Sequence, residues 1–245
     1  MISLRRTAPF RTVTALFIVL LSTGAVRAQG LRVMPVSIQM APGQNATTMT
    51  VVNEGSATTA IQIRTYAWNQ PNGKDQLDAS DEVVASPPIA SIAPRAQQLI
   101  RLVLRHSPQE REATYRIVLD QIPAAGVPGV VQVVLRMSIP IFAQPTIRAL
   151  PHVQFHIESD AGQIYLVGIN DGLRHEVIRD IVLLSSDGRK LWSESSASPY
   201  ILAGATRRWP IALQGSLPLK TDALRLTAQA DTTSIEQQVQ VVGTP

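Results

Sequence analysis

Residues 130–142, VVQVVLRMSIPIF, decide the fold class of this chain. The even positions of this stretch include Gln132, Arg136 and Ser138, whereas the odd positions are all apolar: Val131, Val133, Leu135, Met137, Ile139 and Ile141. Hydrophobicity that alternates with a period of two is typical of a β-strand, because successive strand side chains point to opposite faces. The stretch therefore predicts a strand with one wholly apolar face.

Similar short strands precede this stretch. Turn-forming residues separate them, as in residues 53–55 (NEG), 69–73 (NQPNG) and 86–88 (SPP). We expect strands at residues 31–40 (interrupted at Pro35), 46–52, 59–68, 96–104 and 114–122. About seven strands at intervals of roughly ten residues is the pattern of an immunoglobulin-like sandwich.

The alternating pattern restarts after residues 143–151 (AQPTIRALP), which have the composition of a linker. Further strands are expected at residues 152–158, 163–169, 177–184, 189–192, 208–213, 223–230 and 235–242. No segment shows a convincing helical period. We therefore predict an all-β protein with two tandem immunoglobulin-like β-sandwich domains, at residues 29–145 and 146–245.

Residues 1–28 have the organisation of a secretory signal peptide. A basic start is followed by an apolar run at residues 13–21 (VTALFIVLL), which is too short to span a bilayer, and small residues lead to Ala28. We expect cleavage after Ala28 and a product in a bacterial periplasm. An uncleaved anchor is the alternative, but Arg27 closes the apolar run. No other stretch reaches about 18 apolar residues, so we expect no stable membrane insertion.

The charge of the chain belongs to this leader. The full sequence has 22 Lys and Arg against 18 Asp and Glu, a net charge of +4, and four of the arginines lie in residues 1–28. The remainder is formally neutral. A neutral chain lacks the basic surface by which proteins bind nucleic acids, so no nucleic-acid partner is expected.

No motif for catalysis is found in the sequence. It contains no phosphate-binding glycine loop, no Gly-x-Ser-x-Gly elbow and no zincin motif. His152 and His156 share one face of an expected strand, but they would lie about 13 Å apart, too far to bind one zinc ion. We expect no catalytic residue, no metal site and no cofactor.

Four stretches resemble the N-terminal domain of periplasmic pilus-assembly chaperones of the chaperone–usher pathway. They are residues 86–94 (SPPIASIAP), 98–102 (QLIRL), 115–123 (YRIVLDQIP) and 136–142 (RMSIPIF). Their order, after a signal peptide and before a second β domain, makes the resemblance specific. The SIPIF stretch is more similar to the archaic branch of the family. The last domain resembles the family only in size and type.

The resemblance implies donor-strand complementation, in which the chaperone lends its G strand to a pilus subunit that lacks its own last strand. The implied partners are pilus or fimbrial subunits and an outer-membrane usher that receives them. Val131, Val133 and Leu135 are implied to insert into the subunit groove, with Met137 on the same face. When free, such a strand needs a partner or self-capping by oligomers. From the residues alone, this face could equally pack in the protein's own core.

The best-known branch of the family holds the subunit's terminal carboxylate with an Arg on the first strand and a Lys on the G strand. Pro140 occupies the position of that Lys here. We expect Arg116 and Arg136, on neighbouring strands, to form the anchor instead, with Arg101 as a third candidate. The alternative is that these arginines cap the sheet surface or pair with Asp120.

A second class of function stays open at this point. The same two domains would suit a structural or adhesive immunoglobulin-like module of the cell envelope. A chaperone leaves the finished fibre, whereas such a module stays in it.

Overall fold

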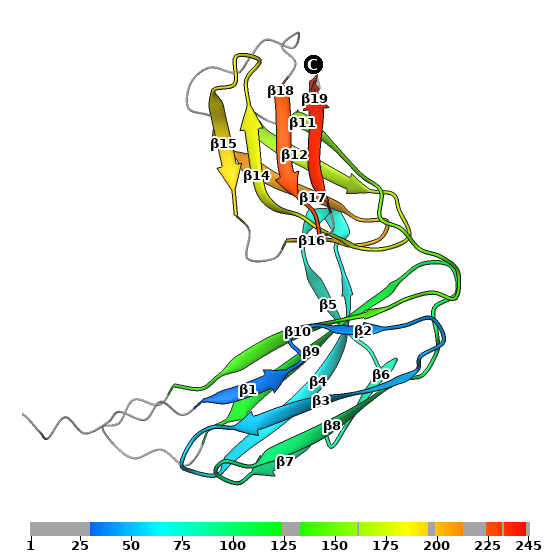
Figure 1. Ribbon diagram of the computed structural model, residues 1–245, viewed down its shortest axis with the longest axis vertical. Coiled ribbons are helices and arrows are strands. Elements are labelled where there is room, and N and C mark those ends of the chain that lie inside the picture. Colours follow the sequence, from blue (N-terminus) through cyan, green and yellow to red (C-terminus); the bar gives the residue numbers. More distant parts are fainter. Residues whose placement is uncertain are drawn as a thin grey trace, which may run out of the picture.

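The computed structural model describes residues 30–123, 133–160, 162–195, 199–212, 224–231 and 233–243. In these ranges the chain forms two β-sandwiches, one above the other in Figure 1, and the only helical element is a short 3-10 turn, η1 (Pro71–Gly73). The prediction of an all-β fold built from two immunoglobulin-like sandwiches is confirmed. None of the described segments is a helix long and apolar enough to cross a membrane.

The first sandwich contains a sheet of four strands packed on a sheet of six. The smaller sheet has the order β1 (Leu31–Met34), β3 (Ala46–Asn53), β8 (Gln97–Leu104) and β6 (Val83–Ser86). The larger has the order β2 (Ile38–Met40), β10 (Arg136–Ala143), β9 (Ala113–Ile122), β4 (Thr59–Asn69) and β5 (Gln76–Ala79), with β7 (Ile89–Ile92) beside β4. Only β2 and β10 pair in parallel within this sandwich.

The expected first strand is divided between the two sheets. β1 pairs with β3 in one sheet, and β2 pairs with β10 in the other. The break falls at Pro35, which has no backbone N–H for a ladder hydrogen bond. Because the chain changes sheets here, β2 covers the edge of only the last part of β10.

Alternate residues of these strands make the core of the first sandwich. Those exposed by less than 5 % include Met49, Val51, Ile61, Ile100, Leu102, Ile117, Leu119, Ile139 and Ile141. Removing such side chains from water stabilises the fold by about 25 cal/mol per Å² of apolar area. The period of two seen in the sequence is the direct result of this one-sided burial.

The second sandwich follows with a separate core. One sheet has the order β17 (Thr206–Ile211), β12 (Gln163–Asn170), β11 (Val153–Asp160) and β20 (Val241–Gly243). The other has the order β15 (Lys190–Glu194), β14 (Arg179–Leu184), β18 (Leu224–Gln229) and β19 (Ser234–Val239), and a short pair joins β13 (Glu176–Val177) to β16 (Tyr200–Ile201). Its core includes Phe155, Leu166, Leu183, Trp209 and Leu226.

A buried asparagine closes a corner of each sandwich. Asn53 and Asn170 are 1 % and 0 % exposed. In both, the side-chain NH₂ donates to main-chain carbonyls of a neighbouring segment, and the side-chain oxygen accepts the N–H of the glycine two residues later, Gly55 or Gly172. The two Asn-acidic-Gly turns of the sequence therefore have the same structural role, because a buried amide needs all of these partners.

Replacing Gly172 with alanine should destabilise the protein. A Cβ on Gly172 would lie 2.4 Å from the main-chain nitrogen of His152 and 2.6 Å from the carbonyl oxygen of Leu150, and neither can move without shifting the segment between the domains. We expect the free energy of unfolding to fall by about 1–3 kcal/mol, measured by urea denaturation. Gly30→Ala is the control, since its nearest contact is the Glu54 side chain at 3.7 Å. Equal stability of the two variants would contradict the close approach at Gly172.

Candidate functional site

The joint between the two sandwiches is built around the long hairpin of β4 and β5, whose tip reaches β17 of the second sandwich (Figure 1). Gln70 joins the domains through two hydrogen bonds: its side-chain oxygen accepts the Leu202 N–H at 2.9 Å, and its NH₂ donates to the Tyr200 carbonyl at 3.0 Å. Arg207 adds an ion pair with Asp75 at 3.3 Å. The hairpin thus fixes one sandwich against the other.

An aromatic cluster fills the joint beside this hairpin. Trp68, Phe142 and Leu202 are buried, and Tyr200 packs against them. The Trp68 ring lies 6.0 Å from Phe142 and 5.4 Å from Tyr200, the latter edge to face. Aromatic rings prefer such tilted contacts, and the cluster forms an aromatic platform between the domains.

Arg116 lies on this platform. Its guanidinium carbon is 3.6 Å from the centroid of the Trp68 ring and 5.7 Å from that of Tyr200. Burial lowers the pKa of Arg116, and the charges of Asp75 and Tyr200 oppose that effect. Arginine stays charged in proteins, so the site presents a partly desolvated cation held on a ring face.

Arg136 lies elsewhere on the same face. It is opposite Asp120 in the β9–β10 ladder, whereas Arg116 is opposite Pro140. Arg136 bonds to the Asp120 carboxylate, and that carboxylate also binds Arg64 at 2.5 Å. These bonds hold the pKa of the Asp120 carboxyl below its usual range.

The structure places the two arginines of the expected anchor, Arg116 and Arg136, apart on this face. Pro140, the residue opposite Arg116, comes four positions after Arg136, which corresponds to about 13 Å along a strand. Arg101 belongs to the other sheet of this sandwich, where it lies exposed on β8. The structure separates the three candidates, and Arg136 already has a carboxylate partner.

The expected donor strand is divided into two parts. Val131 lies outside the described residues. Val133 and Leu135 precede β10 and are 89 % and 38 % exposed. Met137 is half-buried against the protein's own core, in which Ile139 and Ile141 are members. The apolar face thus leaves the sandwich between Met137 and Leu135, and the alternative of packing in the protein's own core holds for the C-terminal half of the stretch.

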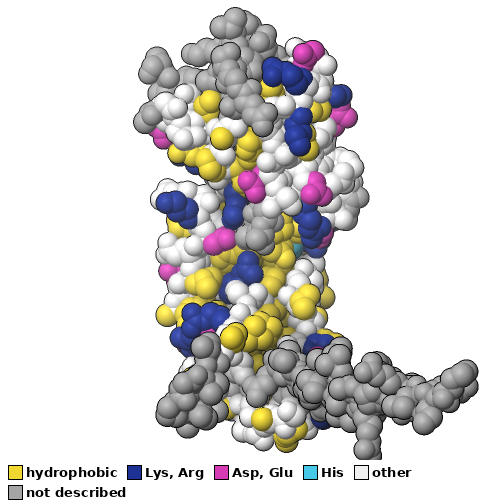
Figure 2. Space-filling model, turned by 90° about the vertical axis from the view of Figure 1, so that its left-hand side faces the viewer, with side chains coloured by type: hydrophobic (Ala, Val, Ile, Leu, Met, Phe, Trp, Pro, Cys, Tyr) yellow, Lys and Arg dark blue, Asp and Glu magenta, His cyan; other side chains and the backbone are white. Residues whose placement is uncertain are grey.

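The outer edge of β10 is partly open. Its inner neighbour β9 pairs along its whole length, but β2 pairs only with Ile141, Phe142 and Ala143. No described strand covers the outer edge of residues 136–140. An unpaired edge of this kind accepts an additional strand from another chain. Figure 2 shows hydrophobic side chains and arginine or lysine side chains close together along the middle of one face of the molecule.

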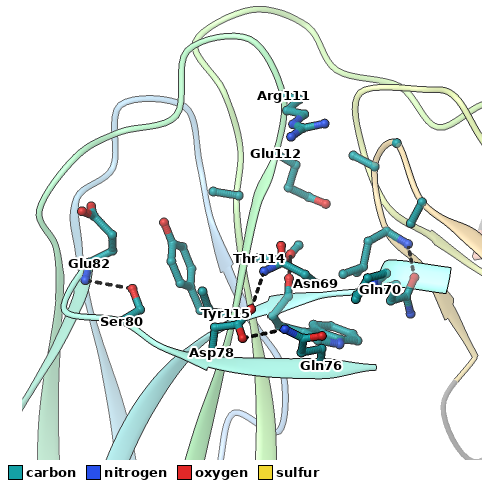
Figure 3. Close-up of a pocket in the computed structure, with 18 residues that line it drawn as sticks. Asn69, Gln70, Gln76, Asp78, Ser80, Glu82, Arg111, Glu112, Thr114 and Tyr115 are labelled. Carbon is teal, nitrogen blue, oxygen red and sulfur yellow. Dashed lines mark hydrogen bonds between the residues drawn. The ribbon is translucent and has the colours of Figure 1, made fainter. Parts of the chain in front are cut away.

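An open cavity of about 730 Å³ lies where the hairpin meets the second sandwich, and Figure 3 shows Glu112 and Arg111 at its border. Glu112 accepts two hydrogen bonds from His175 of the second domain, one from the ring nitrogen Nδ1 at 2.6 Å and one from the main-chain N–H at 2.9 Å. The His175 ring stacks on Phe142 at 3.6 Å. Sequence reasoning did not find this buried pair, because nothing in either segment indicates that the two meet.

Comparison with known protein families identifies the first domain. Residues 30–148 match the model of the pili and flagellar-assembly chaperones, PapD N-terminal domain. The first sandwich therefore belongs to this chaperone family. No curated protein sequence matches it significantly.

Solved structures of pilus chaperones share the fold of both domains. A chain of the CsuC–CsuE chaperone–tip subunit complex from the archaic Csu pili of Acinetobacter baumannii matches with a TM-score of 0.66 and 19 % identity, covering 87 % of this chain and 99 % of that one. The E. coli chaperone DraB matches with a TM-score of 0.56 and 17 % identity, covering 86 % and 97 %. The Salmonella enterica SafA pilin–SafB chaperone complex gives 0.60 and 12 %, covering 87 % and 98 %. These likenesses extend the pilus-chaperone fold beyond the family match, into the second sandwich.

Proposed function

We propose that this protein is a periplasmic chaperone that binds pilus subunits by donor-strand complementation and delivers them to an outer-membrane usher. The observation that carries the proposal is the course of the β10 stretch. It begins as exposed apolar residues at 133–135 and continues as a strand whose outer edge is open over residues 136–140. The family match and the similar chaperone–subunit complexes support the same function.

The physical basis of subunit binding would lie in this stretch. Main-chain groups of the open edge would pair with an unpaired strand of the subunit, which otherwise lacks hydrogen-bond partners. Val133 and Leu135 would fill apolar pockets of the subunit groove, together with Val131. Burying each of these side chains contributes about 1.5–3 kcal/mol. Met137, half-buried in the free protein, would contribute less.

We assign the carboxylate anchor to Arg116 rather than to Arg136. Arg116 lies directly across from Pro140, which occupies the position of the family's G-strand Lys. Its guanidinium is held on the Trp68 ring at the joint of the two domains. A forked, preorganised cation binds a carboxylate through two parallel hydrogen bonds, each stronger than a neutral one. Arg136, in contrast, is occupied by Asp120.

Arg116→Ala should weaken subunit capture about ten- to hundredfold, since a hydrogen bond to a charged group contributes roughly 1.5–3 kcal/mol. Arg116→Lys should give an intermediate loss, because lysine keeps the charge but not the fork. The measurement is the Kd for a subunit from the same gene cluster, together with the melting temperature of each free variant. Arg101→Ala, on the opposite sheet, is the control and should bind normally. Normal binding by a folded Arg116→Ala protein would show that the anchor lies elsewhere.

The location and the absence of catalysis also belong to this proposal. Residues 1–29 lie outside the described part of the chain, and cleavage after Ala28 stays a prediction. The relatives belong to a family of chaperones rather than enzymes, which supports a binding role without chemistry. Recovery of the mature protein from finished fibres, instead of from a soluble complex with a subunit, would favour a structural or adhesive module.

A further inference from the structure

We propose that Asp120 and Gln121, at the end of β9, are positioning residues that fix the register in which residues 133–135 are offered to a subunit. This inference rests on the proposed function, because it concerns how the same donor segment is held before a subunit arrives.

Gln121 holds both main-chain groups of Leu135. The Gln121 N–H donates to the Leu135 carbonyl at 2.9 Å, and the Leu135 N–H donates to the side-chain oxygen of Gln121 at 3.2 Å. Leu135 lies outside β10, whose first ladder pair is Arg136 with Asp120. The glutamine side chain therefore takes the place of a main-chain acceptor and extends the ladder by one residue.

Asp120 fixes the adjacent residue from the side. Its carboxylate joins Arg136 of β10 to Arg64 of β4, so that three neighbouring strands are tied at one point. The Asp120 side chain is only 15 % exposed, against 43 % for Arg64 and 70 % for Arg136. Both arginines lower the pKa of Asp120, so the carboxylate stays ionised. The bonds from the two guanidiniums to this carboxylate are charge-assisted, and such bonds are stronger than neutral hydrogen bonds.

These contacts lie immediately beside the exposed donor residues. A strand that slips by one residue turns every side chain to the opposite face, which would direct Val134 instead of Val133 and Leu135 into the groove. Val134 is itself apolar and 51 % exposed, so composition alone does not prevent this slip. Holding Leu135 and Arg136 in place selects the odd-numbered face. It also removes backbone freedom before binding, which lowers the entropic cost of capture.

The first test uses the free chaperone. Hydrogen exchange at the Leu135 amide should become about tenfold faster in Gln121→Ala, because that amide loses its acceptor. Gln121→Glu keeps an acceptor oxygen and should restore protection. Gln97→Ala, an exposed glutamine on β8, is the matched control. Unchanged protection of Leu135 in Gln121→Ala would overturn the role of the side chain.

The second test measures register in the complex. Val133→Cys supplies one cysteine in the chaperone. Single cysteines are then placed along the groove of a subunit from the same gene cluster, and the N-terminal extension of that subunit is removed. The parent of this test, which carries Val133→Cys alone, should form a disulfide with one groove position. Adding Gln121→Ala or Asp120→Asn should give a mixture of disulfides with positions shifted along the groove, and binding should be about tenfold weaker.

The outcomes separate the two proposals. A parent protein that binds no subunit would overturn the proposed function and this inference together. Variants that keep the parent's Kd and its single disulfide partner would overturn only the positioning role. A general loss of stability would weaken binding but would not shift the disulfide position. The denaturation midpoint of each variant is compared with that of the parent to detect such a loss. If Asp120→Asn fails to fold, Gln121→Ala with its Gln121→Glu rescue still decides the question.

Discussion

Replacement of Glu112 with alanine is expected to lower the free energy of unfolding by about 3–5 kcal/mol, since removal of one partner leaves the other buried without compensation. The Glu112 side chain is 0 % exposed and that of His175 is 3 % exposed. The variant would remove the acceptor of both the His175 ring and the His175 main-chain N–H. Urea denaturation followed by tryptophan fluorescence measures the loss, because Trp68 lies in the same joint.

Two further variants make this result specific. Asp171→Ala removes the carboxylate from an exposed pair with His152, whose side chains are 60 % and 63 % exposed, and should cost at most about 1 kcal/mol. The double variant Glu112→Leu with His175→Phe replaces both polar groups with apolar ones and should recover much of the stability lost in Glu112→Ala. A Glu112→Ala protein as stable as Asp171→Ala would contradict the buried pair across the joint.

Changing Val133 to aspartate should reduce subunit recovery to background while the melting temperature of the free chaperone stays within a few degrees of the parent. Val133 is 89 % exposed in the free protein, so a carboxylate there remains hydrated. In the complex the same carboxylate would enter an apolar groove without a partner. The free energy gained by burying the valine side chain would also be lost. Together these costs exceed roughly 3 kcal/mol, or a loss of more than about a hundredfold in affinity.

The control for this prediction is Val242→Asp, which places the same charge at a 55 % exposed valine on β20 of the second sandwich. It should bind the subunit normally. Periplasmic extracts of cells that co-express each variant with the subunit supply the recovery data, and calorimetry of the purified free protein supplies the melting temperature. Unfolding of the free Val133→Asp protein, or undiminished capture by it, would exclude residue 133 from the donor segment.

The side chains of residues 133–142 pass through three environments in succession. Val133 and Leu135 are exposed, Ile139 and Ile141 lie in the core of the first sandwich, and Phe142 is buried at the joint with the second. The proposed subunit-binding segment is therefore continuous with the protein's own core. Because rigid flanking structure reduces the freedom lost on binding, this continuity favours presentation of the exposed part in one conformation.

The sequence alone determined the all-β class, the division into two sandwiches and the resemblance to pilus chaperones. Alternation along residues 130–142 and the turn residues between strands are local properties. An apolar period of two indicates a β-strand with one buried face. The same alternation did not locate the start of β10 at Arg136, since a strand begins where its ladder partner does.

Only the tertiary structure decided which charged groups meet. The β9–β10 register places Arg136 against Asp120 and Arg116 against Pro140, so two arginines that share a sheet face lie apart. Docking of the domains brings His175 to Glu112, 63 residues away in the chain. Hydrogen bonds and ion pairs depend on distances of a few ångströms, and those distances follow from strand register and domain packing rather than from local composition.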